Sequence, residues 1–149
     1  MATTWIVAAD ESRARVLQVA RPERKLEEIE SMLNPEGRLQ DREMQSDAEP
    51  RFSGRAGGGP ASDRETQGAV EHAVKVFARE VGRYLEKART DHRFDELVLV
   101  APPKFLGALR KELDKEVAKL VVQELPKDLS TFNARDLEAY FSKESGRAP

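Results

Sequence analysis

A stretch rich in glycine and arginine at residues 50–67 divides this chain into two parts that must fold differently. Its sequence, PRFSGRAGGGPASDRETQ, contains three consecutive glycines, which offer no side chains for packing. Such a stretch is excluded from a hydrophobic core. It is typical of a tether, or of a loop whose backbone approaches a phosphate or another chain. The rest of the sequence predicts a domain that holds the two ends of this loop.

The part before the loop predicts an antiparallel meander of three strands. Residues 3–9 are mostly apolar and typical of a strand buried on both faces. Residues 13–19 alternate, with Ala14, Val16 and Gln18 on one face and Arg15, Leu17 and Val19 on the other. Residues 26–33 fit a third strand, although their Glu, Leu and Met side chains also favour a helix. From residue 34 to about 63 the sequence has no sustained period, which predicts a long loop.

The part after the loop begins with an amphipathic pattern that predicts a long helix from about Asp63. Its apolar stripe has helical spacing over about five turns and consists of Val70, Val74, Phe77, Val81, Tyr84, Leu85 and Ala88. The opposite face is basic and carries Lys75, Arg79, Arg83 and Lys87. We therefore expect this helix to lie on the sheet and to expose a basic ridge.

The remaining sequence predicts alternating strands and helices. Residues 94–101 read as a central strand, and Pro102-Pro103 pre-sets the start of a helix whose apolar face includes Phe105 and Leu109. Residues 117–125 alternate as a short strand, and a last helix starts near Asn133. The fold class is therefore α/β (α+β), with helices packed on a mixed sheet of about five strands. We expect a single domain at 1–142, with its long Gly/Arg loop at about 34–63, and a frayed tail at 143–149.

Composition excludes several classes of function. The chain of 149 residues has no cysteine, so disulfides, thiol catalysis and thiolate metal sites are excluded. Its net charge of −2 gives no overall field that attracts nucleic acid or membranes. The N-terminal residues lack a signal-peptide pattern, and the apolar runs are too short to span a bilayer. We expect a cytoplasmic protein without a membrane segment, a cofactor or a metal.

Four stretches of the sequence resemble the bacterial host-attachment protein family. They are WIVAADESRARVLQV, residues 34–47 with the loop that follows, Phe77-Ala78, and LVLVAPPKFLGALRKEL at Leu97–Leu113 with Asp128-Leu129 further on. That family is similar to the middle domain of archaeal and eukaryotic peptide-release factors. The resemblance implies a sheet of RNase H-like topology that displays a glycine-rich loop ahead of a long helix. It also implies contact with the ribosome or tRNA.

The release-factor loop ends in Gly-Gly-Gln, which promotes hydrolysis of peptidyl-tRNA. Here the corresponding segment is GRAGGGP at residues 54–60, and no glutamine follows the glycine pair. The resemblance therefore predicts a non-catalytic module that is associated with RNA or the ribosome. Its candidate contact residues, in the loop and on the basic helix face, are Arg51, Arg55, Gly57, Gly58, Gly59, Arg64, Lys75, Arg79 and Arg83.

Two alternatives stay open at this point. The first is a protein-interaction module in attachment or surface physiology, whose loop orders on a partner. The second is a hydrolase that acts on peptidyl-tRNA or RNA, with Asp10, Glu71 and Asp95 as a carboxylate cluster for two metals. Simpler roles also suit these carboxylates: Asp10 in a turn, Glu71 paired with Lys75, and Asp95 at a strand start. His72 and His92 are the only histidines and form no evident ligand set.

Overall fold

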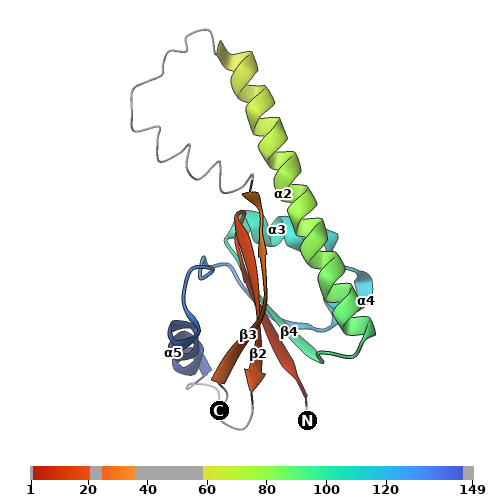
Figure 1. Cartoon of the computed structure of the whole chain (residues 1–149), viewed down its shortest axis with the longest axis vertical. Helices are drawn as coiled ribbons and strands as arrows, with labels where there is room; N and C mark the ends of the chain where they lie inside the picture. The colour runs from red at the N-terminus through yellow and green to blue at the C-terminus, as the bar shows by residue number, and fades with distance from the viewer. Residues whose placement is uncertain (1, 21–24, 36–58, 146–149) are drawn as a thin grey trace.

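The computed structural model describes residues 2–20, 25–35 and 59–145, with backbone only for 59–67 and 143–145. The described elements follow the order β1 (Thr4–Ala9), β2 (Arg13–Ala20), β3 (Lys25–Leu33), α2 (Gly59–Thr90), β4 (Glu96–Val100), α3 (Pro103–Glu112), α4 (Lys115–Lys119), β5 (Val121–Leu125) and α5 (Ala134–Ser145). One face of the sheet carries α2, α3 and α4, and the other carries α5 (Figure 1).

The five strands form one mixed sheet in the order β3-β2-β1-β4-β5. The first three strands pair antiparallel because short connections join them. β4 pairs parallel with β1, and β5 with β4, because a helical crossover precedes each of them. The α/β class, the five-stranded mixed sheet and the opening meander are confirmed. The segment at 26–33 is a strand, so the helix that its composition also favoured is wrong.

Both faces of the central strands are buried, as their apolar composition predicts. On one face, Trp5, Val7 and Leu99 pack under α2 and α3. On the other face, Ile6, Val98 and Val100 pack with Leu129 and Leu137 near α5. The alternation predicted for β2 is confirmed, because Ala14 and Val16 join the first cluster and Leu17 joins the second.

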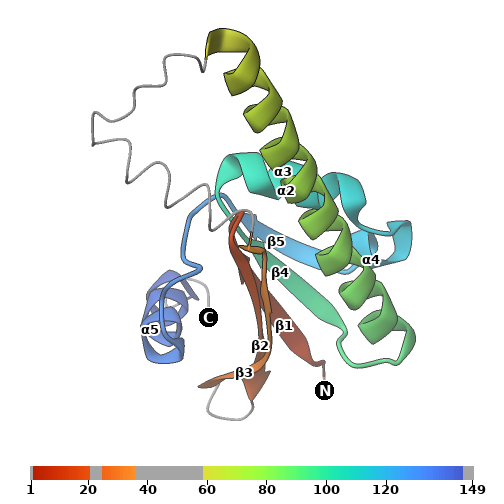
Figure 2. The same ribbon diagram turned by 45° about the horizontal axis from the view of Figure 1, so that its top comes forward.

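The long helix α2 packs its predicted stripe on the sheet, with Phe77, Val81 and Leu85 fully or almost fully buried. Its N-terminal half projects beyond the sheet (Figures 1 and 2). The helix begins at Gly59, several residues before the expected start near Asp63, so residues 59–62 belong to α2 and not to the loop. Pro60 fits a first helical turn, because its fixed φ is already helical and its missing N–H would have no partner there.

The C-terminal part differs from the prediction in one element. Residues 117–125 were expected as one strand, but Lys115–Lys119 form α4 and only Val121–Leu125 form β5. Asp114 caps α4 by accepting a hydrogen bond from the Glu116 N–H at 2.9 Å, which favours the helix locally. The start predicted for the last helix is confirmed, since the Asn133 side chain accepts from the Asp136 N–H at 2.7 Å. This helix continues to Ser145, past the domain limit expected at 142.

Of the helices in the described ranges, not one combines the length and the apolar composition that crossing a membrane requires.

Candidate functional site

A groove of about 760 Å³ lies between α2 and α3 and is the candidate site. The two helices meet where Gly82 of α2 lies against the backbone of Glu112 in α3. Toward the N-terminal half of α2 they diverge, and the groove occupies this space. We call it the α2–α3 groove. Its lining consists of Glu11, Val70, Glu71, Val74, Lys75, Pro103, Lys104, Gly107, Ala108, Lys111 and Glu112.

The floor of the groove is apolar because each helix presents small or aliphatic side chains there. Val70 and Val74 lie one turn apart on α2 and are half-buried. Gly107 and Ala108 face them from α3, beside Pro103. A Cβ atom added to Gly107 would meet nothing within 4 Å, so this position opens directly into free space.

The rim of the groove carries three exposed lysines from two helices, Lys75 on α2 and Lys104 and Lys111 on α3. Within the part of the chain that the structure describes, these three ammonium groups make no ion pair. Lys104 and Lys111 are two helical turns apart, or about 10.5 Å along the axis. The rim can therefore hold two separate anionic groups.

Three carboxylates, from Glu11, Glu71 and Glu112, line the same groove. Glu112 accepts from Arg79 Nε at 3.4 Å, and its side chain is only 18% exposed. The ion pair that the spacing of Glu71 and Lys75 predicts is not formed among the described contacts. The groove therefore carries side chains of both charges. The carboxylates of Glu11 and Glu71 can accept hydrogen bonds from a ligand there.

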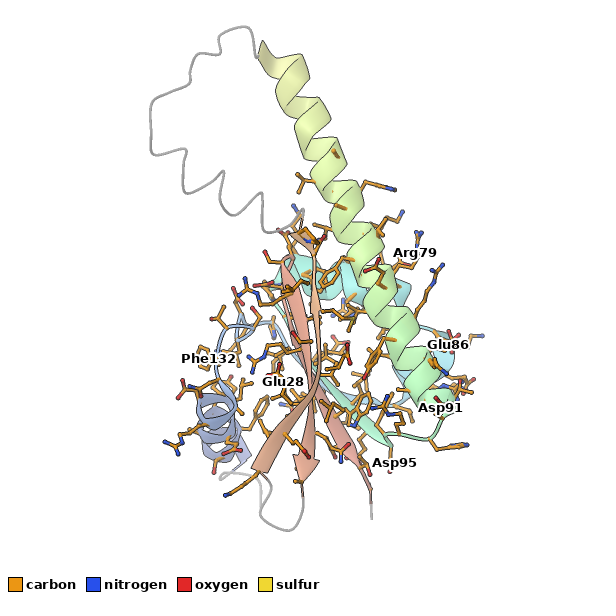
Figure 3. All side chains as sticks on the ribbon, in the orientation of Figure 1. Glu28, Arg79, Glu86, Asp91, Asp95 and Phe132 are labelled. Carbon is orange, nitrogen blue, oxygen red and sulfur yellow. The ribbon has the colours of Figure 1, made fainter. Side chains whose placement is uncertain are left out.

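The basic ridge predicted on α2 is divided by its neighbours. Lys75 faces the groove, whereas Arg79 is bound to Glu112. Arg83 lies beside Glu86 and Asp91 in a separate shallow hollow. Figure 3 shows Arg79, Glu86 and Asp91 along this side of the helix. The lysines share the groove with Glu11 and Glu71, but they make no ion pair among the described contacts, and they are therefore the candidate anion site.

The loop candidates fall largely outside the described residues. Arg51, Arg55, Gly57 and Gly58 belong to the part of the chain that the structure does not describe. Gly59 and Arg64 lie in the first turns of α2, and only their backbone is described. Their contacts with RNA or a partner stay a prediction.

The three carboxylates proposed for a metal cluster are not brought together. Asp10 follows the end of β1 and Asp95 precedes the start of β4, and because these strands are parallel the two residues lie at opposite ends of the sheet. Asp95 accepts from the Thr3 N–H at 2.7 Å, and Asp10 accepts from the N–H groups of Ser12 and Arg13. Figure 3 shows Asp95 near the N-terminus. Among the described residues, no cluster of three histidines or carboxylates could hold a metal ion.

Sequence reasoning missed Lys104, Lys111 and Glu11 as site residues. A signal for the two lysines was present, because Lys104, Gly107, Ala108 and Lys111 have the spacing of one helical face. This face combines small and basic residues and is therefore not a core stripe. Glu11 had no such signal, since its place in the groove depends on how α2 and α3 sit above the turn between β1 and β2.

Two comparisons place the chain among known sequences. The profile of a family described as "Protein required for attachment to host cells" matches residues 5–141. The chain is also similar to an uncharacterized protein, RP470, of Rickettsia prowazekii (strain Madrid E), with 39% identity over 71 residues. That alignment covers 46% of each chain, so it spans about half the length of this curated relative.

Proposed function

The chain belongs to the family of proteins required for attachment to host cells, and from its α2–α3 groove we propose that it is a non-catalytic RNA-binding module. One observation carries the proposal: Lys75, Lys104 and Lys111 surround a single groove without ion-pair partners in the described part of the chain. Ribosomal RNA or tRNA is the proposed source of the phosphates.

Phosphate binding suits these lysines better than it suits the arginines of α2. An ammonium group without an ion-pair partner can contact a phosphate directly, and the RNA then releases the counterions that were bound to that phosphate. Arg79 already contacts Glu112 Oε1 at 3.4 Å, so this carboxylate competes with a phosphate for the guanidinium group. We therefore assign the phosphate contacts to the rim of the groove, with Arg83 as an outlying contact.

Fluorescence anisotropy with a labelled single-stranded RNA, measured between 50 and 200 mM salt, tests this assignment. Each phosphate contact contributes about 0.7 to the salt slope for a single strand. The variant with Lys75, Lys104 and Lys111 changed to alanine should lower the slope by about 2. A matched variant changes Lys25, Lys115 and Lys127, which are exposed lysines outside the groove, and should bind nearly as the wild type does. Equal loss in the two variants, or no binding at low salt, contradicts the proposal.

The same anisotropy assay tests the contribution of the loop arginines to RNA binding. Arg55→Ala tests whether the loop adds a phosphate contact to those of the groove. Co-sedimentation with ribosomal subunits, using the wild type and the groove variant, then tests whether the RNA is ribosomal. Sedimentation that is unchanged in the groove variant excludes the groove as the ribosome contact.

A protein-interaction module is the second candidate, and the apolar floor of Val70, Val74 and Ala108 favours it. A photo-crosslinking amino acid placed at Gly107 distinguishes the two functions, since this position opens into the groove. An adduct formed in cells that ribonuclease removes supports RNA. An adduct that protease removes and ribonuclease leaves intact supports a protein partner.

A further inference from the structure

The α2–α3 groove has the size and the lining of a pocket for a small ligand. Its volume of about 760 Å³ lies within the range of ligand sites, which combine an apolar floor with a few convergent polar groups. We propose that this groove binds one nucleotide, with the base on the floor and the phosphate on the lysines. The nucleotide is either free or an unpaired nucleotide of an RNA, and only the RNA form rests on the proposed function.

The floor provides the contact with the base. Val70 and Val74 on α2 face the open position of Gly107 on α3, so a flat ring can enter between the two helices. The lining contains no aromatic side chain. Enclosure between aliphatic groups therefore replaces stacking, and double-stranded RNA, whose bases are already paired, is excluded from the groove.

The carboxylates of Glu11 and Glu71 explain why the site is not simply basic. Carboxylates oppose a phosphate surface, but they accept hydrogen bonds from the amino groups of adenine, cytosine and guanine. The backbone of Glu11 is held in place, because its carbonyl oxygen accepts from Asn34 Nδ2 at 2.9 Å. The two glutamates can therefore favour bases with an amino group, which offers two N–H donors, over uracil, which offers only its N3–H, while a lysine of the rim holds the phosphate.

The test fills the groove and leaves the fold intact. Gly107→Leu projects a side chain into the groove and also raises helix propensity. Gly68→Leu is the matched control, because a Cβ there also meets nothing within 4 Å and the residue does not line the groove. Circular dichroism confirms that both variants fold. Binding is measured by calorimetry with short oligomers of A, C and U, and with AMP, CMP and UMP.

We expect Gly107→Leu to weaken binding of the A and C ligands about tenfold or more, while Gly68→Leu binds as the wild type does. Replacing Glu11 and Glu71 with glutamine should abolish the preference over U ligands, whereas Glu27→Gln on β3 should preserve it. Unchanged binding in Gly107→Leu overturns the pocket, as does binding of neither ligand type by the wild type.

The two types of ligand, oligomers and mononucleotides, distinguish this inference from the proposed function. RNA binding that depends on the lysines but survives Gly107→Leu overturns the nucleotide pocket and leaves the RNA-binding module standing. Binding of AMP or CMP that Gly107→Leu removes, together with no binding of oligomers, supports the pocket and contradicts the RNA-binding module.

Discussion

A Cβ atom added to Gly82 would lie 2.6 Å from the carbonyl oxygen of Glu112. Only glycine allows α2 and α3 to approach this closely. The atom that a Cβ would meet is a backbone oxygen, which cannot move aside as the end of a flexible side chain can. The contact fixes where the two helices cross, and the α2–α3 groove opens from that point. A glycine inside a helix is usually a cost, and here that cost is offset by close helix packing.

Gly82→Ala should therefore destabilise the protein, although alanine is the better helix former. We expect the free energy of unfolding to fall by about 1–3 kcal/mol, because the helices must move apart. Urea unfolding followed by the fluorescence of Trp5, the single tryptophan, measures it. Gly68→Ala is the control and should raise stability by about 0.5–1 kcal/mol, since its surroundings are open. A stable Gly82→Ala variant would show that the crossing tolerates a methyl group.

Arg15 on β2 should contribute strongly to stability through the loop before α5. Its side chain is 10% exposed, binds Glu28 Oε1 at 2.9 Å and donates to the carbonyl oxygens of Ser130 and Phe132. Figure 3 shows Glu28 and Phe132 on the side of the sheet that faces α5. Arg15→Ala leaves these carbonyls unsatisfied and should cost about 2–4 kcal/mol in urea unfolding.

Arg13→Ala is the control for Arg15→Ala, because Arg13 is on the same strand and its side chain makes no ion pair among the described contacts. It should change the free energy of unfolding by no more than about 0.5 kcal/mol. Similar losses in the two variants would mean that the network around Arg15 adds little.

His92→Gly should stabilise the protein. His92 has φ of 59°, and its N–H bonds to the carbonyl oxygen of Arg89 at the end of α2. Glycine adopts this left-handed conformation without the clash of a Cβ, so we expect a gain of about 0.5–1 kcal/mol. Thermal unfolding measures it, with His72→Gly inside α2 expected to lose about 1 kcal/mol. A loss at position 92 would indicate that the imidazole itself contributes contacts.

Glu112→Gln should strengthen RNA binding if the groove is the phosphate site. The change removes one negative charge from the groove and frees Arg79 from its ion pair. We expect affinity to rise about two- to fivefold at low salt and the gain to shrink at high salt. Glu116→Gln on α4, outside the groove, is the matched control and should leave affinity unchanged. Weaker binding by Glu112→Gln contradicts the assignment of the site.

Much of the fold could be predicted because its signals are local. The alternation of Ala14 and Val16 against Leu17 assigns the faces of β2, and the spacing of Phe77, Val81 and Leu85 assigns the buried face of α2. Both patterns follow directly from backbone geometry. The strand expected at 117–125 was partly wrong, because the cap at Asp114 and the burial of Val117 favour a short helix before β5.

The site could be predicted only in part, because its residues come together from distant positions. Lys75 was expected as a contact residue, but Lys104 and Glu11 reach the same groove only after α3 packs against α2. In the sequence alone, Arg79 is as available for a phosphate contact as Lys75 is. Its partner, Glu112, lies 33 residues away, and a pairing at that distance leaves no trace in a local pattern.

The sequence by itself determined the strands, the helices and their buried faces, because period and composition act between near neighbours. Tertiary structure alone decided which charges remain free. The contact of Gly82 with Glu112 sets the crossing of two helices, and that crossing pairs Arg79 with Glu112 and leaves three lysines around one groove. Electrostatic roles depend on distances across the fold, and those distances exist only once the chain has packed.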